Sequence, residues 1–501
     1  MSSKSPTGYS LSVDPISGET TASRDCLLLA KSTNAKVMHE TRLPPVVYFP
    51  IDDLKVPVRD NTDVRTFCPF KGTARYFDLR VEGEWLERAA WHYPKPLPES
   101  RAIDGYVAFV PQVATAMDPE PEHLLKPQEP ALSGPLVEWI LREAGFCRDA
   151  AELTGALGRE LNEHGVIVSR LSVMIWSLHP LTAGQNHIWQ RNTGEVKTYT
   201  PDYGILDNPA FVNSPLRHVS DALGGVRQRL DSGEPEFKFP IIDDLRREGA
   251  TDYVAMPLIF SGGQVNVLTL TCDHPGGFTT ANLGLIFEMS AAIARYYEVF
   301  VLQDNARAIL QTYVGARTAD RVLGGEIRRG DGDDIDAAIL IADLRNSSLL
   351  EQKLGRKAYL DLLNAFFEEC ETIIGGNGGE LLKFIGDAVL AVFPADDDVA
   401  EACHNAASAA RGIADRMARP LLGDGTGHVD CAIGVAFGEV TYGNVGSRGR
   451  LDFTVIGKAT NIAARLSDHC KSCGNRIVVS REIADHVDNS VPLGALELKN
   501  V

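Results

Sequence analysis

The stretch GGELLKFIGDAVLAVF, residues 378–393, decides the fold of the C-terminal part of the chain. Two apolar runs within it meet at Gly386-Asp387, and a Gly-Asp pair suits a tight hairpin turn. Another apolar run, Ala337–Ala342, ends directly at Asp343. Apolar runs of this length bounded by turn residues are typical of buried strands. The sequence therefore predicts a β-hairpin and a further strand in one sheet.

The elements around this hairpin predict an α+β domain. Apolar residues recur at helical spacing between the first strand and the hairpin. A helix at about 398–418 and a strand at 430–437 follow the hairpin. The resulting β-α-β-β-α-β order is the ferredoxin-like arrangement. We expect the domain to end with a Gly-rich loop, a strand at 451–456, a helix at 457–468 and a strand at 475–479.

Composition bounds the class of protein. The 501 residues correspond to about three domains at roughly 150 residues each. The longest apolar runs, Ala337–Ala342 and Ala388–Phe393, fall far short of the about 20 residues that a membrane-spanning helix needs. A net charge of −18 makes nucleic acids and anionic membranes unexpected partners. Nine scattered cysteines without an export signal indicate reduced thiols and a cytoplasmic location.

The N-terminal part is predicted to be a small β domain. Residues 1–23 are polar and small, and we interpret them as a disordered leader. Residues 24–115 are rich in aromatic residues and proline. Segments such as Val46–Phe49 and Ala74–Leu79 suit short strands. The Pro-rich segment 116–135 is predicted to be a semi-rigid linker.

The central part, residues 136–300, mixes helical and strand patterns. Leu136–Leu161 is broadly helical, and Val254–Cys272 alternates like two strands joined at Gly262-Gly263. An α/β domain of sensor size fits this pattern. A long helix then covers residues 282–323.

That helix carries an apolar stripe with spacings of 3, 4, 3 and 4. Such a heptad pattern suits the seam of a dimer, and the same pattern also suits packing on the helix's own domain. Both alternatives remain open at this point. The segment 283–334 is interpreted as a dimerising connector helix and hinge before the catalytic domain, residues 335–501. The stripe consists of Ile286, Met289, Ile293, Tyr296 and Phe300.

Two carboxylates suggest phosphate chemistry. Asp343 follows an apolar strand and Asp387 lies at the tip of the hairpin. Carboxylates at strand ends can share two magnesium ions, which assist attack on a phosphate. Taken singly, each residue is more often a turn residue or a helix cap.

Lys383 interrupts the apolar strand LLKFI, where a charge is costly without a partner. Lysine only donates hydrogen bonds. Adenine has an acceptor at N1 and guanine has a donor there, so a lysine in a purine pocket favours adenine. The alternative is a lysine on the solvated face of an edge strand.

The segment 438–457 contains five glycines and two arginines, and such loops let backbone N–H groups approach phosphates. Asn461 and Arg465 follow it four residues apart, on one helix face. Together they can stabilise charge that develops on a phosphorus centre. Many hairpins and surface arginines share these features.

Residues 335–501 resemble the catalytic domain of class III adenylyl cyclases. The matching motifs occur in the family's order over about 130 residues, which is more specific than any single motif. They are IADL (341–344), GGELLKFIGDAVLAVF (378–393), GEVTYGNVGS (438–447), RLDFTVIG (450–457) and TNIAARL (460–466).

The resemblance implies an enzyme that converts ATP to 3′,5′-cyclic AMP and pyrophosphate. It places Asp343, Leu344 and Asp387 at two divalent cations, Mg²⁺ or Mn²⁺. In this family the catalytic site lies between two catalytic domains, which implies a homodimer. The remaining roles that it implies are adenine reading by Lys383 and Thr454, ribose orientation by Asn461, transition-state stabilisation by Arg465 and triphosphate contact by Arg450.

Thr454 stands where many members of the family have Asp. The chain resembles the Thr-bearing subgroup, whose bacterial members often respond to bicarbonate, so bicarbonate or another small molecule is a possible regulator. Guanylyl cyclases usually pair Glu and Cys at the two base-reading positions, so Lys383 argues against GTP. A cyclase that uses GTP and a non-catalytic nucleotide-binding regulator are the two alternatives.

Three features depart from the family pattern. Asn346-Ser347-Ser348 stands where Gly-Phe-Thr is usual, so triphosphate contacts there are expected to differ. Lys458 replaces a commonly acidic residue. Family members typically continue through one more strand beyond the position of Val501, and a phosphate-binding lysine often lies near that end. Lys499 is the candidate for this lysine.

Two further resemblances cover the rest of the chain. Residues 137–300 resemble a GAF-type sensor through TDYVAMPLIF (251–260) and PGGFT (275–279). The N-terminal domain resembles a small bacterial family of uncertain function through FCPFKGTARYF (67–77). The predicted fold class is therefore α+β multidomain, with an N-terminal mostly β domain, a central GAF-like α/β domain and a C-terminal ferredoxin-like βαββαβ cyclase domain.

Overall fold

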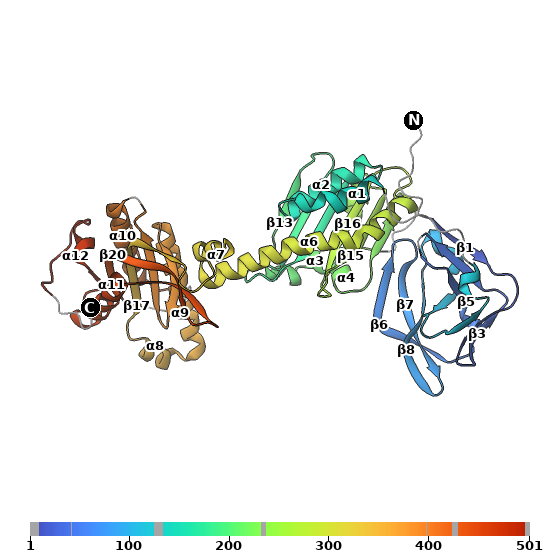
Figure 1. Ribbon diagram of the computed structural model, residues 1–501, viewed down its shortest axis with the longest axis horizontal. Helices are drawn as coiled ribbons and strands as arrows, with labels where there is room; N and C mark the ends of the chain where they lie inside the picture. The colour runs from blue at the N-terminus through green and yellow to red at the C-terminus, as the bar shows by residue number, and fades with distance from the viewer. Residues whose placement is uncertain are drawn as a thin grey trace. The chain divides into compact units, whose positions relative to one another are not determined.

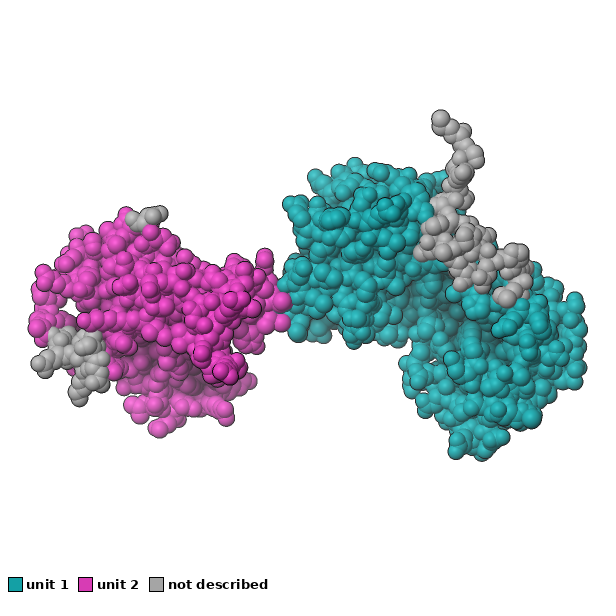
Figure 2. Space-filling view, in the orientation of Figure 1, with its two compact units in different colours: residues 1–305 teal, residues 306–501 magenta. Residues whose placement is uncertain are grey.

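The structure is a computed structural model. The chain divides into two compact units, residues 1–305 and residues 306–501 (Figures 1 and 2). Within the described part of the chain, no helix combines the length and apolar character that crossing a membrane requires. The described residues are 10–41, 43–124, 134–231, 237–396, 398–422 and 429–495.

The first part of unit 1 is built from strands, as predicted. A seven-stranded sheet has the order β1-β4-β5-β9-β8-β7-β6, and a three-stranded sheet has the order β10-β2-β3. Buried residues such as Phe49, Leu79 and Phe109 form the core. The strands are β1 (Leu11–Pro15), β2 (Thr20–Arg24), β3 (Leu27–Ser32), β4 (Lys36–Glu40), β5 (Val46–Pro50), β6 (Val58–Cys68), β7 (Gly72–Val81), β8 (Glu84–His92), β9 (Tyr106–Phe109) and β10 (Ala116–Asp118).

Two predicted boundaries of this part are wrong. The leader was predicted over residues 1–23, but strands β1 and β2 lie within it, because Ile16 and Ala22 are buried in the domain core. Residues 1–9 lie outside the described residues. The linker was predicted over residues 116–135, but strand β10 and the 3-10 helix η3 (Pro121–Leu124) occupy its first part. Its residues 125–133 also lie outside the described residues.

The second part of unit 1 is a six-stranded antiparallel sheet of order β13-β12-β11-β16-β15-β14. Alternate residues of β11 belong to different cores: Leu171 and Val173 pack with helices α2 and α6, and Met174 packs with α4 and α5. Both faces of the sheet are therefore covered. The elements are α1 (Pro135–Arg142), α2 (Ala150–Glu163), β11 (Arg170–Trp176), β12 (Gly184–Gln190), β13 (Val196–Tyr199), α3 (Pro209–Val212), α4 (Pro215–Ser220), β14 (Val226–Arg229), α5 (Pro240–Arg247), β15 (Asp252–Ile259), β16 (Val265–Cys272) and α6 (Thr280–Val314).

The apolar stripe of the long helix packs against its own unit. Ile286, Met289, Ile293 and Phe300 are at most 8% exposed and belong to the core cluster that includes α2 and β11. Tyr296 packs against the same cluster. The heptad pattern was compatible with a dimer seam and with packing on the helix's own domain, and the structure shows the packing on its own domain. These five side chains do not form a free seam on the surface of the helix.

Unit 2 contains the sheet that the hairpin sequence predicted. Its strand order is β18-β19-β17-β20-β21, with β22 parallel to β20. The first four strands give the order expected of a ferredoxin-like βαββαβ fold. Helices α9 and α10 pack on one face and α11 on the other. The elements are α7 (Ala316–Leu323), β17 (Gly332–Leu344), α8 (Ser347–Leu354), α9 (Arg356–Gly376), β18 (Glu380–Ile385), β19 (Ala388–Pro394), α10 (Val399–Met417), β20 (Cys431–Gly446), β21 (Leu451–Gly457), α11 (Lys458–Cys473), β22 (Ile477–Val479) and α12 (Arg481–Ala484).

One element of unit 2 differs from the prediction. The Gly-rich segment after residue 437 was predicted as a loop, but it forms the second half of strand β20. A side chain at Gly443 would place its Cβ 2.3 Å from the carbonyl oxygen of Asp331 and 2.4 Å from the Cα of Gly332, where the neighbouring strand β17 begins. Glycine at this position permits the two strands to approach closely. In the sequence alone, the same glycines indicate a loop.

Candidate active site

The sheet of unit 2 places the two predicted metal-binding aspartates side by side. Asp343 lies near the end of β17 and is paired in register with Ala388 of β19. Asp387 occupies the turn before β19, and the backbone N–H of Leu344 donates to its carbonyl oxygen at 3.4 Å. Gly386 adopts a φ of +65°, the left-handed conformation that this turn needs. Two residues that are 44 positions apart thus meet at one end of the sheet.

Charge is concentrated around Asp343. Burial raises the pKa of its carboxyl group, contact with Lys471 opposes this, and the nearby Asp387 carboxylate raises the pKa further. Lys471 Nζ lies 2.7 Å from Asp343 Oδ2 and 3.9 Å from Asp468 Oδ1. The end of β17 therefore carries a half-buried carboxylate, and the ammonium group of Lys471 is paired with it.

The residues present fit a divalent cation. Asp343 and Asp387 offer carboxylate oxygens, which Mg²⁺ and Mn²⁺ prefer. The side chain of Leu344 is buried, so this residue can offer only its main-chain carbonyl. No group of three or more His, Cys, Asp or Glu side chains that could hold a metal occurs among the described residues. A pair of carboxylates is sufficient, because Mg²⁺ in phosphate-processing sites keeps waters and substrate phosphates as its other ligands.

Lys383 is held by a residue that the sequence analysis did not consider. Its Nζ lies 2.5 Å from Asp452 Oδ2, so strand β18 is tied to strand β21. Phe453 and Val455 face the core, which leaves Asp452 and Thr454 together on the other face of β21. The predicted base-reading residues Lys383 and Thr454 are therefore connected through Asp452, which contacts Lys383 and lies on the same face of β21 as Thr454.

Helix α11 presents the other predicted residues. Asn461 and Arg465 are exposed, whereas Ala463 and Leu466 on the opposite side pack against the sheet. Arg465 Nη1 lies 3.5 Å from Asp468 Oδ2. One exposed face of this helix therefore carries a row of polar side chains that ends at Lys471.

A glycine fixes the position of that helix. A Cβ at Gly434 of β20 would lie 2.1 Å from the carbonyl oxygen of Ala463 and 2.4 Å from the backbone nitrogen of Ser467. The backbone of α11 thus rests directly on β20. Any larger residue at position 434 displaces the helix that carries Asn461 and Arg465.

The remaining predicted positions have simpler surroundings. Arg450 is exposed in the turn between β20 and β21, where its backbone N–H donates to Ser447 Oγ at 3.2 Å. Asn346 has a φ of +57° and precedes helix α8, a conformation that asparagine tolerates better than most residues. Lys458 is the exposed first residue of α11. Lys499 lies outside the described residues.

The predicted metal-binding residues Asp343 and Asp387 form one group, and the predicted base-reading residues Lys383 and Thr454 form another. Within the described part of the chain, no hydrogen bond or ion pair joins these two groups. Asp343 contacts Lys471, whereas Lys383 contacts Asp452. Lys471, Asp452 and Asp468 are the charged residues that sequence reasoning missed. The Lys471–Asp343 and Lys383–Asp452 contacts join residues 128 and 69 positions apart, so local patterns carry no signal for them. Asp468 contacts Arg465 and Lys471 within its own helix.

Comparison with protein families agrees with this geometry. Residues 333–498 match the family "Adenylate and Guanylate cyclase catalytic domain". Residues 13–120 match a domain of unknown function, DUF427. The second match covers the whole of the predicted N-terminal β domain, residues 24–115, and assigns no chemistry to it.

Relatives among curated proteins are themselves uncharacterized. Protein Rv1319c of Mycobacterium tuberculosis is 36% identical over 180 residues, which are 36% of this chain and 32% of that protein. Protein Rv1320c of the same organism is 31% identical over 195 residues, which are 39% of this chain and 33% of that protein. The matched region thus spans about a third of the length of these relatives.

Several solved structures are similar to the chain. A bacterial light-regulated adenylyl cyclase is 27% identical, with 30% of this chain and 79% of that chain covered and a TM-score of 0.28. The adenylyl cyclase CyaB from P. aeruginosa is 25% identical, with coverage of 34% and 90% and a TM-score of 0.30. The guanylyl cyclase Cya2 is also 25% identical, with coverage of 34% and 88% and a TM-score of 0.27. By its sequence match, the C-terminal part of the chain, residues 333–498, is a catalytic domain of the adenylate and guanylate cyclase family.

Proposed function

We propose that the chain is an adenylate cyclase, which converts ATP to 3′,5′-cyclic AMP and pyrophosphate. The observation that carries this proposal is the pairing of Asp343 and Asp387 at adjacent strand ends of a cyclase catalytic domain. Carboxylates in this arrangement bind the divalent cations on which cyclization of a nucleoside triphosphate depends. In the reaction the ribose 3′-oxygen forms a bond to the α-phosphorus, the hydroxyl proton departs, and pyrophosphate leaves.

Each proposed site residue would have a separate role in this reaction. Asp343 and Asp387 would hold Mg²⁺ or Mn²⁺, which supplies Lewis-acid chemistry by lowering the pKa of the attacking hydroxyl and neutralising phosphate charge. Asn461 would orient the ribose by hydrogen bonds. Arg465 would stabilise the extra charge on the phosphoryl oxygens as the bond to pyrophosphate breaks. Arg450 remains a candidate for contact with the triphosphate.

The choice of ATP rests on Lys383. An ammonium group donates hydrogen bonds and accepts none, and adenine offers an acceptor at N1 where guanine carries a hydrogen. Asp452 at 2.5 Å holds the ammonium in place and uses one of its three donors. Thr454, on the same face of β21, can accept from the adenine amino group. These donors and acceptors match adenine better than guanine.

We further propose that two chains build each catalytic site. The aspartate pair and the Lys383 group have no contact with each other in the described chain, so a site that needs both groups can combine them from two copies. A symmetric homodimer would contain two such sites.

Helix α6 offers a surface for this pairing. From Val299 onward, a second set of apolar residues recurs at spacings of 3, 4, 3 and 4, and four of its five members are exposed. Val299, Leu302 and Tyr313 are 50%, 60% and 81% exposed. A parallel two-stranded coiled coil would bury them. The complete stripe is Val299, Leu302, Ala306, Ile309 and Tyr313.

The central sheet domain is proposed to act as a GAF-like sensor that regulates the catalytic domain. Its last element, helix α6, continues across the boundary between the two units at residue 305. A small molecule, bicarbonate among the candidates, would then alter the cyclase rate through this helix.

The test is cyclic nucleotide production by the purified full chain, with Mg²⁺ or Mn²⁺ and with either ATP or GTP. We expect cyclic AMP from ATP, and its loss in the Asp343→Ala variant. Formation of cyclic GMP from GTP, with no product from ATP, would replace the proposed substrate. Binding of ATP without any product, from a folded dimer, would identify a nucleotide-binding regulator in place of an enzyme.

A further inference from the structure

A cavity of about 200 Å³ lies in unit 1, between the N-terminal β domain and the central sheet domain. Among the described residues that line it, four carry cationic side chains and none carries a carboxylate. The cationic lining residues are Arg65, Arg75, Lys95 and Arg227, beside His218.

Two of the arginines face each other directly. Arg65 of β6 and Arg75 of β7 are partners in the antiparallel register. Like charges at such paired positions destabilise a sheet. Neither guanidinium forms an ion pair with any carboxylate of the described residues. An anion between them would remove the repulsion.

The walls of the cavity are built by close packing of the two domains. A Cβ at Gly225 would lie 2.3 Å from the ring of Phe67, and one at Gly224 would lie 2.6 Å from Thr73 Oγ1. Gly224 also has a φ of +100°, which most other residues avoid. The loop before β14 therefore approaches strands β6 and β7 as closely as a backbone can. Phe67 and Phe237 add flat apolar surface to the lining.

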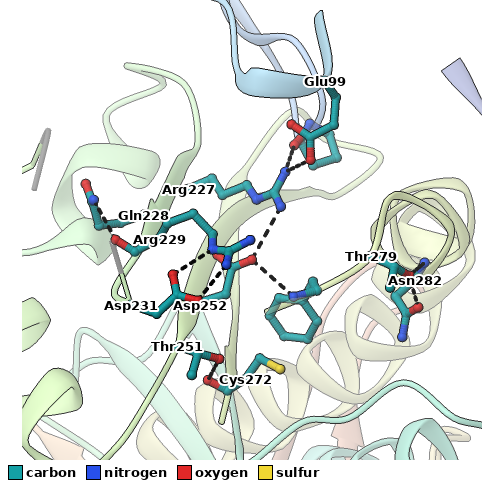
Figure 3. Close-up of polar contacts among 12 residues, drawn as sticks. Glu99, Arg227, Gln228, Arg229, Asp231, Thr251, Asp252, Cys272, Thr279 and Asn282 are labelled. Atoms are coloured by element: carbon teal, nitrogen blue, oxygen red, sulfur yellow. Dashed lines mark hydrogen bonds and ion pairs between the residues drawn. The ribbon is translucent and has the colours of Figure 1, made fainter. Parts of the chain in front are cut away.

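Arg227 links this cavity to the interior. Its guanidinium is buried and contacts Glu99 Oε1 at 2.8 Å, the carbonyl oxygen of Pro69 at 3.1 Å and Asp252 Oδ2 at 3.3 Å (Figure 3). Its Nε has no hydrogen-bond partner in the described chain, and neither has Asp252 Oδ1. This side chain therefore bridges both domains at the wall of the cavity.

The same network reaches the start of helix α6. The backbone N–H of Phe278 donates to Asp252 Oδ2 at 3.2 Å, and α6 begins two residues later at Thr280. Arg227 at the wall of the cavity and the residue two positions before α6 therefore share one acceptor, Asp252 Oδ2. That position suits a regulatory site and not a catalytic one.

We propose that this cavity binds a small polyanion, a molecule with two or more negative charges carried by phosphate or carboxylate groups. The planar, forked guanidinium groups of Arg65 and Arg75 bind either group with paired hydrogen bonds. Phe67 and Phe237 would contact an apolar part of the ligand. The site does not depend on the cyclase reaction, because all of its residues belong to unit 1.

The experiment is isothermal titration of the full chain with inorganic phosphate and, separately, with citrate, in buffer without nucleotide or divalent metal. The test variant is Arg65→Gln/Arg75→Gln, and both positions are exposed, so folding should be preserved. The matched control is Arg80→Gln/Arg101→Gln, which removes the same charge from exposed positions outside the cavity. Thermal melting of each variant verifies that the fold is intact.

We expect one of the two anions to bind the wild type and the control with a dissociation constant of about 1 mM or tighter. Binding to the test variant should be weaker by about tenfold or more, because two charge-assisted contacts are lost. Preference for phosphate or for citrate identifies the charged group that the site reads. Equal affinity in the test and control variants, or no binding of either anion to the wild type, would overturn the proposal.

Discussion

The ammonium group of Lys471 lies 2.7 Å from the carboxylate of Asp343, although 128 residues separate them in the chain. Lys471 is on the last turn of α11, and Asp343 is near the end of β17. The lysine thus places a positive charge on the carboxylate that is proposed to hold a divalent cation. Two cations cannot share one carboxylate without repulsion, so Lys471 has to move when metal binds.

Replacement of Lys471 by methionine should therefore tighten metal binding. A unit charge about 4 Å from a divalent ion opposes binding by about 2 kcal/mol even at the dielectric of bulk water, and salt reduces this for an exposed lysine. We expect the affinity for Mn²⁺, measured by electron paramagnetic resonance without nucleotide, to rise about three- to tenfold. Lys353→Met, which removes an exposed charge from helix α8, should leave the affinity unchanged. Unchanged or weaker binding in Lys471→Met would show that the lysine does not compete with metal.

Asp452→Asn should weaken the recognition of ATP without slowing the chemical step. The carboxylate holds Lys383 Nζ at 2.5 Å, and its loss frees a long side chain that must be ordered again when adenine binds. Ordering such a side chain costs about 0.5–1.5 kcal/mol, so KM for ATP should rise about two- to tenfold. Steady-state kinetics should show kcat within about twofold of the wild type.

The matched control is Asp485→Asn, which removes an exposed aspartate beside Arg481 on α12. This variant should have wild-type kinetics with ATP. A large fall in kcat for Asp452→Asn, with KM unchanged, would instead assign Asp452 a part in the reaction itself.

Gly434→Ala should impair the enzyme by moving α11. The added Cβ would lie 2.1 Å from the backbone of that helix, and a backbone atom cannot move aside without the helix. A displacement of about 1 Å can cost a reaction about 100-fold in rate, so we expect the rate of cyclic AMP formation to fall by at least tenfold. Gly375→Ala, at a helical position with no atom within 4 Å, should retain the activity. Thermal melting followed by circular dichroism separates displacement from unfolding, and wild-type activity in Gly434→Ala would refute the close packing of helix and sheet.

The sheet and the positions of Asp343 and Asp387 could be predicted because local sequence determines them. Apolar runs define β17 and the β18–β19 hairpin; Asp343 directly follows the first run, and Asp387 lies in the turn of the hairpin. The partners of Lys471 and Lys383 could not be predicted, since those contacts join segments 128 and 69 residues apart. Nothing in the pattern of α11 or β21 indicates which distant side chain lies opposite.

One wrong prediction and one open alternative have different physical origins. Gly443 and its neighbours indicated a loop, but in β20 they allow a strand to approach residue 331 closely. The heptad stripe from Ile286 to Phe300 was compatible with two kinds of partner, because the spacing of apolar residues defines a helix face and not what covers it. Only the packing around α6 distinguishes the helix's own unit from a second chain.

His187 should make unit 1 sensitive to acid. Burial lowers the pKa of this imidazole to about 4, below the value of about 6.5 expected in the unfolded chain. The unfolded state therefore gains a proton below pH 6.5 that the folded state does not, so the free energy of unfolding falls as the pH drops from about 6.5 to 4. The loss at pH 4 should be about 2–3 kcal/mol. In His187→Gln, urea unfolding across this range should lack this contribution, whereas His274→Gln at an exposed position should keep it. Equal pH dependence in all three proteins would contradict a neutral buried His187.

Opposite faces of α6 should respond differently to the same substitution. Ile293 is 1% exposed in the core of unit 1, so Ile293→Glu buries a charge and should lower the free energy of unfolding by at least about 3 kcal/mol. Leu302 is 60% exposed, so Leu302→Glu should leave the melting temperature of unit 1 within a few degrees of the wild type.

If the stripe from Val299 to Tyr313 pairs two chains, Leu302→Glu should shift the protein toward monomer in analytical ultracentrifugation and reduce the cyclase rate in parallel. Gln303→Glu, one residue along the same helix and exposed, controls for the added charge. A Leu302→Glu protein that remains dimeric at the concentration of the activity assay would place the contact between chains elsewhere, because glutamates at a paired position of a coiled coil repel each other.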